Sequence, residues 1–126
     1  MTRILIDTHI FLWAITNDRR LSHESRLAFE SAGNELVLSV VSMWEISIKR
    51  SLGKLPLPEP AREFLEAEIS SNRLTVLELN LRHIAELDRL PRLHRDPFDR
   101  VLVAQARAEG IALLSQDTDI LQYNIR

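Results

Sequence analysis

The stretch Arg3–His9, RILIDTH, decides the fold, because it is a short apolar run that ends directly in an acid. Continuous apolar runs of this kind are typical of strands in a parallel sheet that is covered on both faces. Two later runs have the same form: ELVLS at 35–39 and IALLSQD at 111–117. LTVLEL, at 74–79, is a fourth predicted strand.

Helical patterns lie between these runs. Five helices are predicted, over residues 23–33, 40–53, 61–71, 81–90 and 97–110. Ser22 is a good N-cap for the first, which we expect to end at Gly33, and Gly53 and Gly110 are typical helix stops. Pro97 suits the first turn of the last helix. Strands that alternate with helices predict an α/β protein, a three-layer α/β/α sandwich around a central, mostly parallel sheet.

The bulk composition is that of one ordinary globular domain spanning residues 1–126, with 45% hydrophobic and 27% charged residues. The chain has no cysteine, which excludes disulfides and zinc–thiolate sites and favours a reducing, cytoplasmic location. No apolar run approaches the roughly 20 residues that a membrane span needs. A formal charge of −2 excludes a global basic footprint, so a nucleic acid would have to be held by local patches or through metal ions.

Two acids follow predicted strands directly. Asp7 comes immediately after ILI, and Asp117 lies just beyond IALLS. In open parallel sheets, ligand sites form outside the carboxyl ends of the strands. We therefore expect both carboxylates at one mouth of the sheet.

A third acid, Glu45, falls within the apolar face of its predicted helix, together with Val41, Trp44, Ile48 and Leu52. Burying an unpaired carboxylate destabilises a protein by several kcal/mol, so a carboxylate at this position needs a partner or a function. A functional role is one reason. An ion pair with Lys49, one turn later, is the other.

Asp96 and Asp99 stand at the start of the last predicted helix, within HRDPFDRVLVAQA. Asp96 precedes Pro97, and this arrangement favours an N-cap. Asp99 would lie in the first turn, where the helix dipole favours an acid, and that turn would face the same mouth. We interpret Asp99 as functional and Asp96 as a cap.

Four carboxylates at one mouth need protons or cations to neutralise them, because each close pair repels by roughly 3 kcal/mol. Oxygen ligands without cysteine favour Mg²⁺ or Mn²⁺ over zinc. The chemistry that suits such a site is hydrolysis of a phosphodiester, with a cation that activates water.

With these blocks in place, the chain resembles the PIN-domain ribonucleases, and among them the VapC toxins of bacterial toxin/antitoxin systems. The resemblance covers essentially the whole chain. Its carriers, in order, are ILIDTHIFLW, LSVVSMWEISIK, HRDPFDRVLVAQA and LLSQD. It implies a PIN-like fold and a metal-dependent endoribonuclease that cuts RNA, forms a homodimer and binds a cognate antitoxin.

The resemblance also implies roles for individual residues. Asp7, Glu45, Asp99 and Asp117 match the catalytic, metal-binding acids, and Asp96 would add a contact behind them. Thr8 and Ser115 match positions where relatives carry a hydroxyl near the metal or the substrate phosphate; threonine is more usual than serine at the second.

Other polar and aromatic residues have two interpretations each. His94, Arg95 and Arg100 surround Asp99 and are expected either to contact RNA phosphates or to form a solvated rim. His9 either faces the mouth or is a hydrogen-bonded residue at a helix start. Trp13 and Trp44 either stack on bases or, as their neighbours favour, pack in the core or a dimer interface. The segments IFLWAI and EFLEAEI are candidates for a partner surface.

Rival functions fit the sequence less well. A haloacid-dehalogenase-like phosphatase needs a second Asp where the chain has His9, and a receiver domain needs a lysine after a late strand. The remaining alternative is a non-catalytic member of the same fold that binds RNA or an antitoxin. The sequence identifies neither the RNA and its cleavage site nor the number of metal ions.

Overall fold

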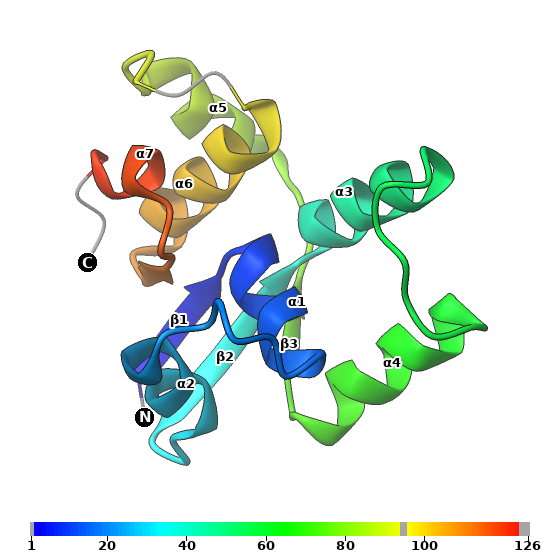
Figure 1. Cartoon of the computed structure of the whole chain (residues 1–126). Coiled ribbons are helices and arrows are strands. Elements are labelled where there is room, and N and C mark those ends of the chain that lie inside the picture. The colour runs from blue at the N-terminus through cyan, green and yellow to red at the C-terminus, as the bar shows by residue number, and fades with distance from the viewer. Residues whose placement is uncertain (1, 94–95, 124–126) are drawn as a thin grey trace.

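A sheet of parallel strands runs through the centre of the molecule (Figure 1). The structure is a computed structural model that describes residues 2–93 and 96–123. Within these ranges the sheet has four strands: β1 (Thr2–Ile6), β2 (Asn34–Ser39), β3 (Thr75–Leu77) and β4 (Ala112–Leu114). Their order is β3-β2-β1-β4, and all three pairings are parallel.

Seven helices surround this sheet in the same described ranges. They are α1 (Thr8–Ile15), α2 (His23–Glu30), α3 (Val40–Ser51), α4 (Ala61–Ser71), α5 (Leu81–Arg89), α6 (Pro97–Glu109) and α7 (Thr118–Leu121). Figure 1 shows α5, α6 and α7 grouped on one side of the sheet and α1, α2 and α4 on the other. The predicted α/β sandwich is therefore confirmed, with a sheet that is parallel throughout.

Two apolar cores make the three layers. Leu5 of β1 and Leu113 of β4 point into one core, which is filled by α6 residues such as Leu102 and Val103. Ile6 points into the opposite core, against helices that include α1 and α3. Successive strand residues face opposite sides, so a run such as ILI must be apolar throughout to fill both cores.

Several element boundaries differ from those predicted. The helix from His23 ends at Glu30, so Gly33 does not stop it and the prediction there was wrong. By contrast, Gly53 and Gly110 have the left-handed φ values of 71° and 67° expected of helix stops. Helices α1 and α7 are not among the five helices predicted from the sequence. No helix within residues 2–93 and 96–123 has the length and apolar content to cross a membrane.

Candidate active site

Asp7 and Asp117 lie together at the carboxyl edge of β1 and β4, as predicted. Asp7 follows β1 and caps α1, its Oδ1 accepting from the Ile10 amide at 2.7 Å. Asp117 caps α7, its Oδ1 accepting from the Asp119 amide at 2.8 Å. Both carboxylates line one small pocket of about 160 Å³, shared with His9, Trp13 and Gln116.

The Ser115 hydroxyl joins the two acids. It donates to Asp7 Oδ2 at 2.5 Å and accepts from the Asp117 amide at 3.0 Å. The serine therefore holds the Asp7 carboxylate and the backbone of Asp117 in a fixed relation, although 108 positions separate Ser115 from Asp7 in the chain.

The environment of Asp7 disfavours the charged form of its carboxyl. The residue is only 2% exposed, and burial raises the pKa of its carboxyl above the usual 3.8. Hydrogen bonds from Ser115 and Ile10 and the nearby His9 lower this pKa, while the charge of Asp117 raises it further. A buried carboxylate beside a second one favours a proton or a cation as its neighbour.

Glu45 is buried on α3, as predicted, but on a different helix face. Trp44 and Leu52 are 60% and 61% exposed, so their predicted place on the buried face was wrong, whereas Val41 is buried as predicted. The buried positions are Val41, Ser42, Glu45 and Ile46. A shift of the buried face by part of a turn moves Trp44 into solvent and keeps Glu45 inside.

The Glu45 carboxylate is fully engaged. Lys49 forms an ion pair with Oε2 at 2.8 Å, as one of the two interpretations predicted. Thr8 donates to Oε1 at 2.7 Å and lies 2.8 Å from the Ser42 hydroxyl. Because Thr8 directly follows Asp7, this hydrogen bond ties Glu45 to the end of β1.

The first turn of α6 lies beside α3. Asp96 is the N-cap, with Oδ1 accepting from the amides of Phe98 and Asp99 at 2.9 and 3.3 Å, which confirms the capping prediction. Asp99 is buried in that first turn, at 7% exposure. Trp44 and Phe98 meet edge to face, with ring centroids 5.1 Å apart, and so connect the helices that carry Glu45 and Asp99.

The donor chemistry of these four acids fits a hard cation, since every side-chain ligand is a carboxylate oxygen. Within the described ranges, however, no three His, Asp or Glu side chains are gathered closely enough to hold a metal ion together. Glu45 is bound to Lys49 and Thr8 instead. The assignment of four metal ligands stays a prediction.

Of the three basic residues predicted around Asp99, the structure describes Arg100. His94 and Arg95 lie outside the described residues. Arg100 donates to the Pro91 carbonyl at 3.1 Å and to the Tyr123 hydroxyl at 3.3 Å, so its guanidinium connects loop and C-terminal segments. Its predicted contact with RNA is untested. His9 is exposed and faces the pocket of Asp7 and Asp117.

Two further residues of the site were missed by sequence reasoning. Ser42 lies three residues before Glu45, so helical spacing alone places it on the same face. Gln116 lines the Asp7 pocket and bonds to the Ser22 amide and the Arg20 carbonyl. No local pattern around Gln116 signals these contacts, because their partners are 94 and 96 positions away.

The amino-acid sequence of the chain is similar to those of two known ribonucleases. Ribonuclease VapC16 of Mycobacterium tuberculosis is 33% identical over 63 residues, which are 50% of this chain and 45% of that protein. Ribonuclease VapC22 of the same organism is 27% identical over 118 residues, 93% of this chain and 88% of that protein.

A solved structure, described as VapBC2 from Rickettsia felis bound to a DNA fragment from their promoter, has the same fold. Its matching chain has a TM-score of 0.73 at 16% identity, over 97% of this chain and 93% of that one. The PIN-domain family profile matches residues 4–125, nearly the entire sequence. The chain therefore belongs to the PIN domain family.

Proposed function

We propose that this protein is a divalent-metal-dependent endoribonuclease and the toxin of a toxin–antitoxin pair. The observation that carries the proposal is the buried Asp7 carboxylate, held beside Asp117 at the mouth of a PIN-fold sheet. The acids of α3 and α6, Glu45 and Asp99, are presented by neighbouring helices. The ribonuclease names of the two Mycobacterium tuberculosis relatives support the reaction type.

Asp7, Glu45, Asp99 and Asp117 would hold Mg²⁺ or Mn²⁺. When bound, the cation supplies an attacking water of lowered pKa and offsets negative charge on the phosphate. A bound cation would also offset the effect of the Asp117 charge on the Asp7 carboxylate.

The surrounding side chains keep these acids in place. Ser115 orients the Asp7 carboxylate, and Thr8 orients that of Glu45. The Lys49 ammonium balances the charge of Glu45 and would share this carboxylate with a bound cation. Support of this kind is worth about 10- to 100-fold in metal affinity or activity.

The proposed substrate is RNA, and the proposed partners are a cognate antitoxin and a second copy of the chain in a homodimer. The partner proposal follows from the solved neighbour, whose description is of a VapBC assembly. At 16% identity the similarity to this structure shows a shared fold. The proposal therefore names RNA and an antitoxin only as classes of partner.

The test is cleavage of total RNA by the purified protein with Mn²⁺, with Mg²⁺ and with chelator. Asp99→Asn is assayed beside it, because this change keeps the side-chain volume and removes the charge. Asp88→Asn is the matched control, since Asp88 is an exposed aspartate of α5. We expect metal-dependent fragments from the parent and the control and none from Asp99→Asn.

The alternative is a non-catalytic module that binds RNA or an antitoxin, which the engagement of Glu45 by Lys49 and Thr8 favours. A Mn²⁺ titration separates the two functions. An inert module binds no Mn²⁺ in a manner that depends on Asp7 or Asp99. Absence of cleavage together with absence of such a site would overturn the proposed nuclease.

A further inference from the structure

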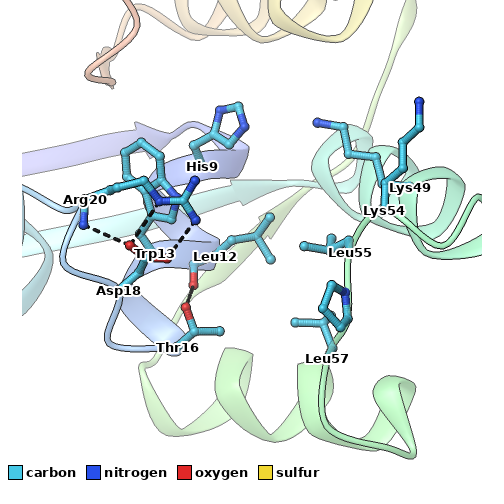
Figure 2. Close-up of a pocket in the computed structure, with 11 residues that line it drawn as sticks. His9, Leu12, Trp13, Thr16, Asp18, Arg20, Lys49, Lys54, Leu55 and Leu57 are labelled. Carbon is cyan, nitrogen blue, oxygen red and sulfur yellow. Dashed lines mark hydrogen bonds and ion pairs between the residues drawn. The ribbon is translucent and has the colours of Figure 1, made fainter.

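A second, larger cleft opens beside the candidate active site. Its volume is about 530 Å³, and its walls are α1 on one side and the end of α3 with the following residues 54–57 on the other. Figure 2 shows His9 and Trp13 facing Lys49 and Lys54 across this cleft. His9 and Trp13 also line the small pocket of Asp7 and Asp117, so the two spaces are neighbours.

The floor of the cleft is apolar. Leu12, Leu55 and Leu57 lie along it, below the charged ends of the two lysines (Figure 2). His9 and Trp13 form a stacked pair at one side, with ring centroids 5.5 Å apart. A ligand for this cleft therefore needs a flat or apolar part that fits the floor and an anionic part that fits the rim.

The rim is cationic although the whole chain carries a formal charge of −2. Three cationic side chains and one carboxylate line the cleft: Arg20, Lys49, Lys54 and Asp18. These two lysines are the only lysines in the chain, whose other 14 basic residues are arginines. Both lysines of the chain thus line the cleft beside the candidate site.

Two of the three cations already have anionic partners. Arg20 pairs with Asp18 at 2.8 Å and lies over the Trp13 ring at 5.2 Å, and Lys49 pairs with Glu45. Lys54 follows α3 and is exposed, and no carboxylate among residues 2–93 and 96–123 forms an ion pair with its ammonium group. Lys54 is therefore the cation of the cleft that is available to a ligand.

We propose that this cleft binds a nucleotide of the RNA that adjoins the scissile phosphate, with Lys54 on a backbone phosphate and the base over the leucine floor. The inference rests on the proposed function, which places the scissile phosphate at Asp7 and Asp117. The cleft volume lies within the roughly 300–1,000 Å³ of small-molecule sites. Proteins that hold single-stranded nucleic acid combine a cationic groove with aromatic side chains on which bases stack. The stacked His9–Trp13 pair and Lys54 supply both kinds of group in this cleft.

The first test measures binding to a short, randomised, fluorescently labelled single-stranded RNA. Asp7→Asn serves as the background, so that cleavage does not consume the probe. We expect Lys54→Gln to weaken binding about fivefold, the upper end for one exposed ion pair. The slope of log affinity against log salt should fall by about 0.7, the value for one lost phosphate contact with a single strand. Lys54→Arg should retain binding.

Arg62→Gln is the matched control. Arg62 lies on α4 outside the cleft, and its pair with Glu66 is exposed, so the change removes one positive charge without touching the proposed subsite. Equal losses from Lys54→Gln and Arg62→Gln would show a general charge effect and would overturn the proposal.

The second test uses Lys54 as a reporter of RNA binding. Acylation of the folded protein, followed by mass spectrometry, should modify Lys54 readily, and saturating RNA should protect it. Failure of RNA to protect Lys54 would overturn the proposal. Protection by an added protein partner and not by RNA would do the same and would reassign the cleft.

Cleavage kinetics separate this inference from the proposed function. In the parent background, Lys54→Gln should raise KM and leave kcat unchanged, since Lys54 binds RNA equally before and during reaction. Cleavage with an unchanged KM would retain the nuclease and remove the subsite. Absence of cleavage with Lys54-dependent RNA binding would retain the subsite and remove the nuclease.

Discussion

Asp7 combines three contacts in one side chain. One carboxylate oxygen caps α1 through Ile10, the other accepts from Ser115, and the whole group lies near Asp117. Any substitution at this position therefore tests a helix cap, a buried hydrogen bond and a charge at the same time. Asparagine retains an oxygen that can cap α1 and removes the charge, while its amide nitrogen replaces the oxygen that accepts from Ser115.

We predict that Asp7→Asn lowers RNA cleavage at least about 100-fold, the scale on which one charge-stabilising group contributes. The melting temperature should stay the same or rise, because the change removes the charge of a buried carboxylate that lies near a second carboxylate, Asp117. Cleavage assays and thermal unfolding in chelator measure the two effects. Asp88→Asn is the control, and a variant that still cuts at the parental rate would take Asp7 out of the mechanism.

At the residue scale, the positions of the acids could be predicted and their partners could not. Asp7 and Asp117 follow apolar runs, and the end of such a run predicts the end of a strand. The contacts of Glu45 depend on the rotation of α3 about its axis. The sequence places Trp44 on the apolar face, whereas the edge-to-face contact with Phe98 holds it at the surface. That contact is between helices, and a single helical wheel does not contain it.

The start of α6 is the element on which the position of Asp99 depends. Its N-cap, Asp96, satisfies the amides of Phe98 and Asp99 itself. The opposite end has Gly110 in the left-handed conformation, which ends the helix before β4. Both ends of α6 are thus defined by local side-chain and backbone chemistry.

We predict that Asp96→Ala destabilises the protein by about 1 kcal/mol, the usual value of a lost N-cap. Asp96→Ser should restore most of this free energy of unfolding, because serine caps well. Urea denaturation measures both. If alanine proved as stable as aspartate, the Asp96 cap would contribute nothing to the free energy of unfolding.

A polar cluster around the buried His83 joins α5 to α6 away from the candidate site. His83 is fully buried, and its Nδ1 accepts from the Asn80 amide at 3.2 Å. This assignment leaves the proton on Nε2, which lies 2.8 Å from Glu109 Oε2. Arg82 pairs with the same carboxylate at 2.7 Å.

This cluster gives stability a pH dependence. The hydrogen bond from His83 holds the pKa of Glu109 below its usual 4.5, against the opposing effect of burial, and the charge of Arg82 lowers this pKa further. A carboxyl with a depressed folded-state pKa stabilises the protein above its unfolded-state pKa. That stability is lost as pH falls through the folded-state value.

We therefore predict that the parent is more stable than Glu109→Gln near neutral pH, and that the difference disappears as pH falls below about 4.5. Thermal unfolding of both proteins across this range measures it. Glu66→Gln, at an exposed pair on α4, is the control. A difference that persists in acid would assign the stabilisation to packing rather than to charge.

At the element scale, the sequence predicted helices with polar faces or clear ends and missed the others. The α1 segment THIFLWAI buries most of its first half, so it lacks the polar face that marks a surface helix. The α7 helix has four residues, too few for any periodicity. Gly33 was expected to stop α2, but three residues lie between the end of that helix and the start of β2.

At the scale of the whole molecule, a bound cation would be a structural element. The candidate ligands come from the ends of β1 and β4 and from α3 and α6, so binding would connect parts of the fold that are far apart in the chain. A ligand that binds only the folded state stabilises it by mass action.

We predict that Mn²⁺ at about 100 times its dissociation constant raises the melting temperature by roughly 10 °C, from about 2.7 kcal/mol of added stability. Chelator should reverse the shift, and Asp7→Asn should reduce it. Differential scanning fluorimetry is sufficient for this measurement. An equal shift in the parent and in Asp7→Asn would place the cation elsewhere.

The parallel sheet also means that the groups around Asp7 are synthesised at very different times. β1 sits between β2 and β4, and the bond that completes the Asp7 contacts comes from a serine 108 positions later. At about 5–20 residues per second, a ribosome takes roughly 5–20 s to make that stretch. Throughout this interval the growing chain carries Asp7 without Ser115 or Asp117. A site that needs all of these groups would thus stay incomplete until Ser115 and Asp117 have been made.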